Sequence, residues 1–432
     1  MHGSNGRNRS SRLFDIVGHY HAARRSLHTP ASAQSRRGLD WMNFFVADVQ
    51  TGFGTFVAFY LAQIGWSGGN IGVALAVSGI AGMLSQIPGG AVADAVRWKR
   101  GLAALGILLT GAAALVLAIA PGFYAVFVAQ ILQGATAGIL TPAIGAISLG
   151  LVGRKAMSLR TGRNLRYAAA GHVVTAAIMG AAGAYLANGA IFFCAAGLCI
   201  PALIALSFIR SDEIDYARAR NATPAGNAKS APRAAGLVDL AKNHKLVLFT
   251  AAIVLFQLVD ASMLPLIGEN LARSIHDDAA LWLSGLVIVP QVVVAFLAPW
   301  VGFHSEKRGR RPLILIGFAL EPLRALLLVV STVYPVLVVA QVLSGLTGAV
   351  IGVMTVIVVA DLTAGSGRFN LALGVVGALT GIAATISTSA TGYMFEALGP
   401  RLGFLPLAVV AAAATLLVWR FLVETKPEKY DE

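Results

Sequence analysis

The sequence has few charged residues and few cysteines, and its polar residues are not distributed as in a water-soluble protein. Only 12% of the 432 residues are charged and 57% are hydrophobic, whereas soluble domains carry about 25% charged and about 45–50% apolar residues. The two cysteines, Cys194 and Cys199, lie in one apolar run and leave no framework of crosslinks. These shortages exclude a soluble enzyme, a disulfide scaffold and a disordered tail protein. A polytopic membrane protein remains.

Apolar runs long enough to span a bilayer recur along the whole chain. A spanning helix needs ~20 apolar residues. The ranges that meet this criterion are 39–64, 69–93, 101–120, 122–152, 164–187, 189–209, 246–271, 281–303, 312–331, 334–361, 369–395 and 401–423. The sequence therefore predicts an all-α membrane protein with twelve transmembrane helices.

The net charge of +13 follows the loops and does not require a nucleic-acid partner. If both termini are cytoplasmic, 30 of the 33 Lys and Arg residues fall in the cytoplasmic tails, loops and adjoining helix ends. This distribution is the positive-inside rule, and it also favours contact with anionic lipid of the inner leaflet. We therefore expect a multi-pass protein of the cytoplasmic (inner) membrane, with both termini cytoplasmic, membrane lipid as a partner and no nucleic acid.

Polar segments divide the chain into two halves and two tails. Residues 1–37 are basic and lack the apolar core of a secretory signal, so we interpret them as a cytoplasmic tail, either a surface helix or disordered. Residues 210–245 are rich in charged residues, Pro and Gly, and indicate a flexible cytoplasmic linker. We expect six-helix halves at 38–209 and 246–423, and a short cytoplasmic tail at 424–432.

The two halves share repeated segments. VAQILQGATAG at 128–138 is echoed by VAQVLSGLTGA at 339–349, an offset of 211 residues. Further on, GRN at 162–164 is echoed by GRFN at 367–370. A third pair of matching segments lies in the loops after the second helix of each half. Three matches in order at nearly one offset predict two pseudo-symmetric bundles related as parallel repeats.

The matching loops carry the resemblance to a known family. Each has a Gly, three residues, an acid and then a basic cluster, as GAVADAVRWKR and as GFHSEKRGRR. They resemble the signature loop of the major facilitator superfamily, and the resemblance covers 39–423. Its residues are Gly90, Asp94, Lys99 and Arg100 in the first loop, where Arg97 replaces the usual Gly, and Gly302, Glu306, Lys307, Gly309, Arg310 and Arg311 in the second. Segments such as DVQTGFGTF and SQIPGGAVAD resemble a bacterial group of mostly unassigned substrate.

The resemblance implies that these loops gate the cytoplasmic side. Gly residues let two helices approach closely, and the acid can accept hydrogen bonds from a facing helix N-terminus or a basic side chain. We expect Asp94 and Glu306 to hold the cytoplasmic side closed in one conformation. The alternative is that they only anchor the helix ends among lipid headgroups. Asp361, at the inner end of the span 334–361, is a further candidate for gating.

Ionisable residues inside the spans are candidate functional residues, because each costs ~2.5–3.5 kcal/mol on insertion scales. A carboxylate in a low-dielectric cavity binds protons near neutral pH, and His titrates there as well. We therefore expect Asp48, Asp260 and His172 to couple transport to protons, although Asp48 could instead pair with a loop arginine and His172 could be a packing group. Glu321 and Arg324, one helical turn apart, are expected to form a structural ion pair.

Amide side chains are the expected ligands of a polar substrate. The resemblance implies that the first, fourth, seventh and tenth helices line a central cavity, where the repeat partners Gln130 and Gln341 would face one another. Amides offer donors and acceptors without charge, although hydrogen bonding between helices explains them equally well. The expected cavity residues are Asn43, Gln50, Gln130, Gln133, Gln257, Gln291 and Gln341.

These features predict a secondary active transporter that moves a small solute by alternating access. We expect a monomer, not an enzyme, with no cofactor or bound metal, driven by protons and exporting small organic compounds. Two features of related drug exporters are absent, an Arg in place of Gln130 and a Gly-Pro signature in the fifth helix. Alternatives are an uptake symporter for a polar metabolite, a metal exporter, a non-transporting membrane protein and a membrane-embedded enzyme. ATP-driven transport lacks the required phosphate-binding loop.

Overall fold

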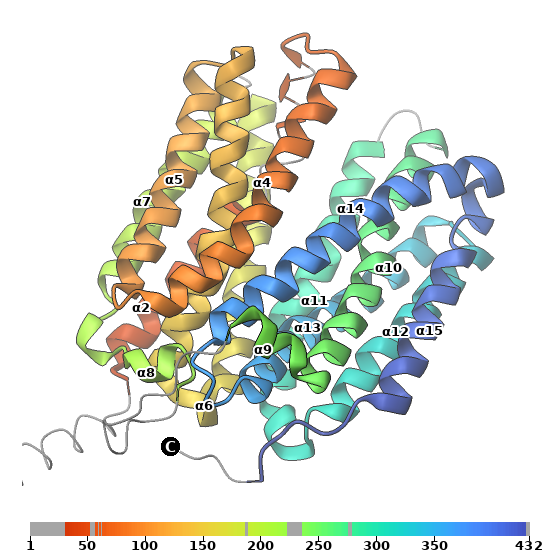
Figure 1. Cartoon of the computed structure of the whole chain (residues 1–432). Helices are drawn as coiled ribbons and strands as arrows, with labels where there is room; N and C mark the ends of the chain where they lie inside the picture. Colours follow the sequence, from red (N-terminus) through yellow and green to blue (C-terminus); the bar gives the residue numbers. More distant parts are fainter. Residues whose placement is uncertain are drawn as a thin grey trace, which may run out of the picture.

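The computed structural model describes residues 31–51, 57–58, 60–61, 63–185, 189–222, 236–274 and 279–428, and this part of the chain is almost entirely helical (Figure 1). Nine of its helices are long and apolar enough to cross a membrane. The longest of them, α6 (Phe123–Tyr185), breaks at Gly153, where φ is +68°, and so contains two of the predicted spans. The predicted fold class, an all-α membrane protein in two bundles, is confirmed.

The N-terminal half consists of α2 (Ala33–Thr51), α4 (Gly68–Ala95), α5 (Lys99–Ile119), α6 and α7 (Ala190–Ser207). Helix α2 begins six residues before the predicted span because a polar cap forms there. The Ser32 hydroxyl accepts a hydrogen bond from the Ser35 N–H, and both the Ser32 N–H and its hydroxyl donate to Glu213. Glu213 lies in the linker, so this helix start depends on a residue 181 positions away.

The C-terminal half consists of α10 (His244–Ser274), α11 (Ala279–Arg308), α12 (Arg311–Val330), α13 (Tyr334–Leu362), α14 (Phe369–Leu402) and α15 (Leu405–Phe421). Their bounds agree with the predicted spans to within a few residues at most ends. Gly309 has φ of +90° and makes the tight turn between α11 and α12, a conformation that favours glycine.

The described part of the linker is ordered, which differs from the flexible segment that composition indicated. It contains η1 (Ser211–Glu213), α8 (Tyr216–Ala219) and α9 (Leu237–Lys242). The N–H of Asp215 donates to the carbonyl of Gly150, and Asn221 donates to the carbonyl of Ala360. These contacts fix residues 211–222 against both halves. Most of the basic tail at 1–37 lies outside the described residues.

The two halves approach each other most closely at one end of the bundle. We call this end, where α2 begins and α15 ends, the terminal face, and the other end the opposite face. In Figure 1 the N-terminal half (red to yellow-green) and the C-terminal half (green to blue) meet near the terminal face and diverge towards the opposite face. One buried cluster joins Leu149, Met157 and Ala169 of α6 to the core of the C-terminal half.

Candidate functional site

The first contact between the halves is built around Asp94, in the last turn of α4. Its buried carboxylate accepts hydrogen bonds from the N–H groups of Asn370 (3.2 Å) and Leu371 (2.8 Å) and from Asn370 Nδ2 (2.8 Å). Asn370 and Leu371 open α14, so the negative charge lies at the positive end of a helix. A Cβ on Gly90 would overlap the carbonyl oxygen of Asn370, so glycine is required for this approach. We call these four residues the first gate.

The basic residues of the first signature loop bind within the N-terminal half and to the linker. Lys99 is buried and donates from Nζ to the carbonyl of Ala93, near the end of α4. Its ammonium group also lies 5.0 Å from the ring centroid of Tyr216, and the guanidinium of Arg220 lies 4.9 Å from the same ring. Arg100 donates to the carbonyl of Ser207. These contacts fix the linker beside the first gate.

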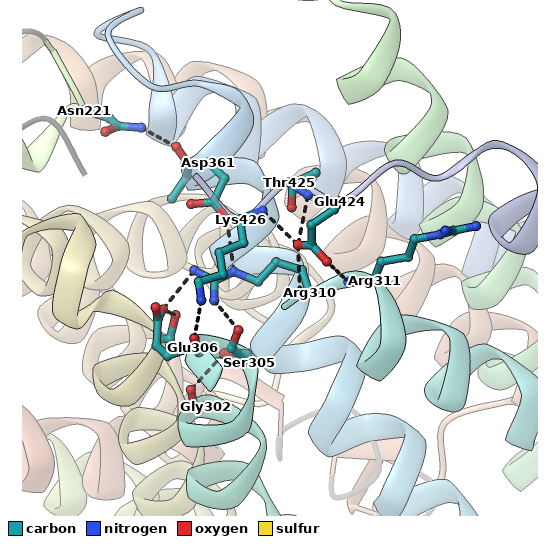
Figure 2. Close-up of polar contacts among 12 residues, drawn as sticks. Asn221, Gly302, Ser305, Glu306, Arg310, Arg311, Asp361, Glu424, Thr425 and Lys426 are labelled. Carbon is teal, nitrogen blue, oxygen red and sulfur yellow. Dashed lines mark hydrogen bonds and ion pairs between the residues drawn. The ribbon is translucent and has the colours of Figure 1, made fainter. Parts of the chain in front are cut away.

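The second contact between the halves is built around Glu306, near the end of α11. Glu306 accepts a hydrogen bond from the hydroxyl of Ser158 on α6 and pairs with Arg310 at 2.9 Å. Arg310 is fully buried and also pairs with Asp361 at 3.2 Å, as Figure 2 shows. A Cβ on Gly302 would overlap the carbonyl oxygen of Ser158. We call Ser158, Gly302, Glu306, Arg310 and Asp361 the second gate.

The segment after α15 folds back onto the second gate (Figure 2). The Glu424 carboxylate accepts hydrogen bonds from the N–H groups of Arg310 (2.8 Å) and Arg311 (3.1 Å), at the start of α12. Lys426 donates from Nζ to the carbonyl of Glu306. Partial burial alone would raise the pKa of Glu424, but hydrogen bonds outweigh it and lower that pKa; the donors are the N–H groups of Arg310, Lys426, Arg311 and Thr425.

A buried ion pair holds the start of the first helix. Asp40 on α2 pairs with Arg160 and with Arg163, each at 2.5 Å. Arg160 continues the network by donating from Nε to Asn164 (2.6 Å), and Asn164 donates to Ser148 (2.8 Å). All five residues belong to the N-terminal half. The network therefore fixes the start of α2 against the middle of α6, on either side of the break at Gly153.

Two cavities lie between the halves. The floor cavity, of about 200 Å³, is lined by side chains that include Asn43, Thr141, Ser148, Thr161, Asn164, Val356 and Leu373. The upper cavity, of about 320 Å³, is lined by side chains that include Gln86, Thr141, Gln257, Leu373 and Thr380. Thr141 and Leu373 line both, so the two cavities adjoin. The described side chains that line them are uncharged, and many can donate or accept hydrogen bonds.

Three charged groups meet near the middle of the C-terminal half. Arg324 on α12 is fully buried and pairs with Asp260 on α10 at 2.6 Å and with Glu321 at 3.5 Å. Glu321 also accepts a hydrogen bond from the Thr347 hydroxyl on α13, at 2.9 Å. Asp260 is one helical turn from Gln257, which lines the upper cavity. We call Asp260, Glu321 and Arg324 the charged trio.

Comparison with known protein families identifies the architecture. The family model described as Major Facilitator Superfamily matches residues 39–290 and 249–432. The chain belongs to the major facilitator superfamily. An uncharacterized MFS-type transporter of Mycobacterium tuberculosis is 35% identical over 390 residues, which cover 90% of this chain and 93% of that protein. Members of the superfamily are transporters, so the chain is a membrane transporter.

More distant relatives and solved structures agree with this assignment. The class D tetracycline resistance protein of Salmonella ordonez is 34% identical over 150 residues, covering 34% of this chain and 37% of that protein. The proton:xylose symporter XylE has a TM-score of 0.70 at 13% identity over 91% of this chain and 96% of its own. The human organic anion transporter MFSD10 has a TM-score of 0.64 at 14% identity, covering 90% and 100%. These structures show that the fold is shared.

Only some of the residues expected in the central cavity line the two cavities of the structure. Asn43 lines the floor cavity and Gln257 the upper one. Gln130 is buried and donates to the carbonyl of Ala74 within its own half, at 3.4 Å. Residues that line neither cavity are Gln130, Gln133, Gln291, Gln341 and His172. The expected pair of Gln130 and Gln341 is therefore not on these cavity walls. The side chains of Asp48 and Gln50 lie outside the described residues.

Several residues of the site were missed by reasoning from the sequence. Asn370 and Asn164 lie in the matching GRFN and GRN segments, which were used only as evidence of repetition. Asp40 pairs with Arg160 and Arg163 of α6, whereas the sequence analysis considered an arginine partner only for Asp48. Ser158 and Glu424 carry no local sequence signal, because each joins the site only through a contact remote in sequence, Ser158 with Glu306 and Glu424 with Arg310.

Proposed function

We propose that this chain is a proton-coupled secondary active transporter of small organic compounds in the cytoplasmic membrane. The observation that carries the proposal is the pair of cavities between two halves that are held together at one face by the two gates; the cavity walls are uncharged and combine apolar side chains with a smaller number of hydrogen-bonding ones. In this conformation the contacts of the two gates would close the cavities from the terminal face. Alternating access requires that the halves rock and that these contacts break.

The two gates would act as reversible latches. In the first, Asp94 binds the start of α14, and in the second, Glu306 binds the Ser158 hydroxyl; both contacts cross from one half to the other. Arg310 and Asp361 belong to the same half as Glu306, so their ion pairs can persist when the halves separate. At the second gate, opening therefore breaks hydrogen bonds between the halves and leaves the buried Arg310 paired with carboxylates of its own half.

The basic loops favour a cytoplasmic terminal face under the positive-inside rule. The structure would then be the conformation that is closed to the cytoplasm, with its cavities on the route to the outside. Asp260 is the proposed proton site nearest a described cavity, and Asp48 and His172 remain further candidates. Export is favoured by the partial similarity to tetracycline resistance proteins. The same geometry would serve an uptake symporter, so direction has to be measured.

Transport by everted membrane vesicles tests this proposal. Vesicles that contain the chain are incubated with a small-molecule extract of the same cells under an imposed proton gradient, inside acidic. Mass spectrometry then identifies the compounds that accumulate. Accumulation that is abolished by a protonophore and absent from vesicles without the chain supports proton-driven export. Loss of preloaded compounds along with protons indicates symport, and movement that ignores the proton gradient contradicts the coupling.

A further inference from the structure

We propose that Glu321, which the sequence assigned to a structural ion pair, is the residue that carries the coupling proton, and that it does so as a member of the charged trio. This inference rests on the proposed function, because it names the group through which proton-coupled transport would work. It gives α12, which the sequence analysis credited only with a structural ion pair, a direct part in the transport cycle.

The charges of the trio do not balance. Arg324 supplies one positive charge, whereas Asp260 and Glu321 would together supply two negative charges. In an environment of low dielectric constant, an uncompensated charge is costly. One proton bound to a carboxylate makes the trio neutral, and its release leaves a net charge of −1. The trio therefore has two protonation states, and excluding water costs more free energy for the state with a net charge of −1 than for the neutral state.

The geometry assigns the proton to Glu321 rather than to Asp260. Asp260 lies closer to Arg324, at 2.6 Å against 3.5 Å for Glu321, and its side chain is 33% exposed. Both features stabilise its ionised form. Glu321 is 2% exposed, and its Oε2 atom is buried without a hydrogen-bond partner. Thr347 and Arg324 both contact Oε1 of Glu321, so a proton on Oε2 displaces no existing hydrogen bond.

Among the described residues, the charged groups that interact with Glu321 are Arg324 and Asp260. Helix α10 contributes Asp260 and helix α12 itself contributes Arg324. Helix α13 contributes a neutral hydroxyl, that of Thr347; its acidic residue, Asp361, lies fourteen residues further along, ~21 Å by helix rise. The basic residue of α15, Arg420, lies in the last turn of that helix, at the terminal face. The net charge around Glu321 is therefore set by the protonation state of the trio.

Protonation couples to the conformational change through hydration. In the present conformation one-third of the Asp260 side chain is exposed, and Gln257, one helical turn away, lines the upper cavity; water that enters from this cavity would tolerate a net charge of −1 on the trio. Closing the opposite face would remove that water, and the closed form then favours the neutral trio. A proton binds Glu321 Oε2 while the opposite face is open, and it leaves after the terminal face has opened. The trio thus permits closure only when a proton is bound.

Distance measurements in liposomes test this inference without a known substrate. Spin labels are attached to cysteines that replace Ile119 at the end of α5 and Val330 at the end of α12, both more than two-thirds exposed at the opposite face. Cys194 and Cys199 are removed. We expect the distance between the labels to shorten as the pH is lowered over a series from roughly 9 to 5. E321Q makes the trio neutral at every pH, so we expect the short distance throughout.

A second variant reports on Glu321 alone and keeps the trio intact. T347V removes the hydroxyl that stabilises ionised Glu321 and touches neither Asp260 nor Arg324 by hydrogen bonding. We expect the midpoint of the distance change to move to higher pH by about one unit. T355V is the matched control, because the Thr355 hydroxyl on the same helix donates only to the carbonyl of Ile351. Its midpoint should stay at the wild-type value.

The outcomes separate this inference from the proposed function. The role of Glu321 is overturned if the label distance depends on pH in the wild type and E321Q shows the same pH dependence. It is also overturned if the midpoint pH of the distance change in T347V equals the wild-type midpoint. Either result leaves proton coupling standing. A wild-type distance that does not respond to pH overturns both. A pH-independent short distance in E321Q and a shifted midpoint in T347V support the assignment.

Discussion

Asp94→Ala perturbs the first gate most directly, and its effect can be estimated from the contacts that it removes. The wild-type carboxylate accepts three hydrogen bonds from Asn370 and Leu371, and all three join the two halves. Each is worth about 0.5–1.5 kcal/mol net. Their loss destabilises the closed terminal face by about 3 kcal/mol, which corresponds to about a hundredfold increase in the population of the open form.

The population of the open form can be measured by cysteine labelling. Val356 lines the floor cavity, so a cysteine in its place is reached from the terminal face only when the gates open. The assay uses everted vesicles and a chain in which Cys194 and Cys199 are replaced. The rate at which a membrane-impermeant maleimide labels this cysteine is then proportional to the population of the open form. We expect Asp94→Ala to raise the labelling rate by about a hundredfold.

A matched control removes a carboxylate that holds no contact between the halves. Asp212 is exposed and pairs with Arg210 at the surface of the linker, so Asp212→Ala should label at the wild-type rate. If Asp94→Ala also labels at the wild-type rate, the hydrogen bonds of Asp94 do not keep the terminal face closed, and the proposed latch is wrong.

Three further predictions concern the second gate, the buried ion pair and the returning C-terminal segment. Gly302→Val places a side chain against the Ser158 carbonyl and should speed labelling of the same cysteine, whereas Gly197→Val, with open space around its Cβ, should not. Asp40→Asn leaves the buried Arg160 without a carboxylate and should lower the free energy of unfolding by about 3–5 kcal/mol, seen as a lower Tm in detergent; an unchanged Tm contradicts this role. Because the folded pKa of Glu424 is lowered, its stabilisation is present above the unfolded pKa and is lost as pH falls through the folded value. The Tm advantage of the wild type over Glu424→Gln should therefore be present at neutral pH, shrink as the pH falls below the ordinary glutamate pKa of about 4.3, and be lost below the folded pKa. An advantage that does not shrink in acid would contradict the hydrogen-bonded carboxylate.

The helices could be predicted from the sequence because their lengths follow from local hydropathy. The predicted spans and the helix bounds agree closely at α4 and α13, where apolar runs end at polar loops. The start of α2 differs because Glu213, remote in sequence, supplies part of its cap. The contacts of the described linker residues were not predictable, since Asn221 donates to the carbonyl of Ala360, which lies in the C-terminal half.

The candidate site could be predicted only in part, because one sequence does not show which faces of two helices meet. Repetition identified both signature loops, yet it did not show that Asp94 binds Asn370 or that Glu306 binds Ser158. Asp260 was assigned to proton coupling, and Glu321 with Arg324 to a separate ion pair. The structure joins these two expectations, since Asp260 and Glu321 contact the same guanidinium.

The central claim is that the two faces of the bundle open in alternation. It is tested most directly by measuring two distances on the same protein in liposomes as pH is varied. One pair of spin labels replaces Ile119 and Val330 at the opposite face, and the other replaces Leu159 and Phe421, both exposed at the terminal face. Alternating access predicts that the terminal-face distance lengthens whenever the opposite-face distance shortens. Distances that stay fixed, or that lengthen and shorten together, would contradict it.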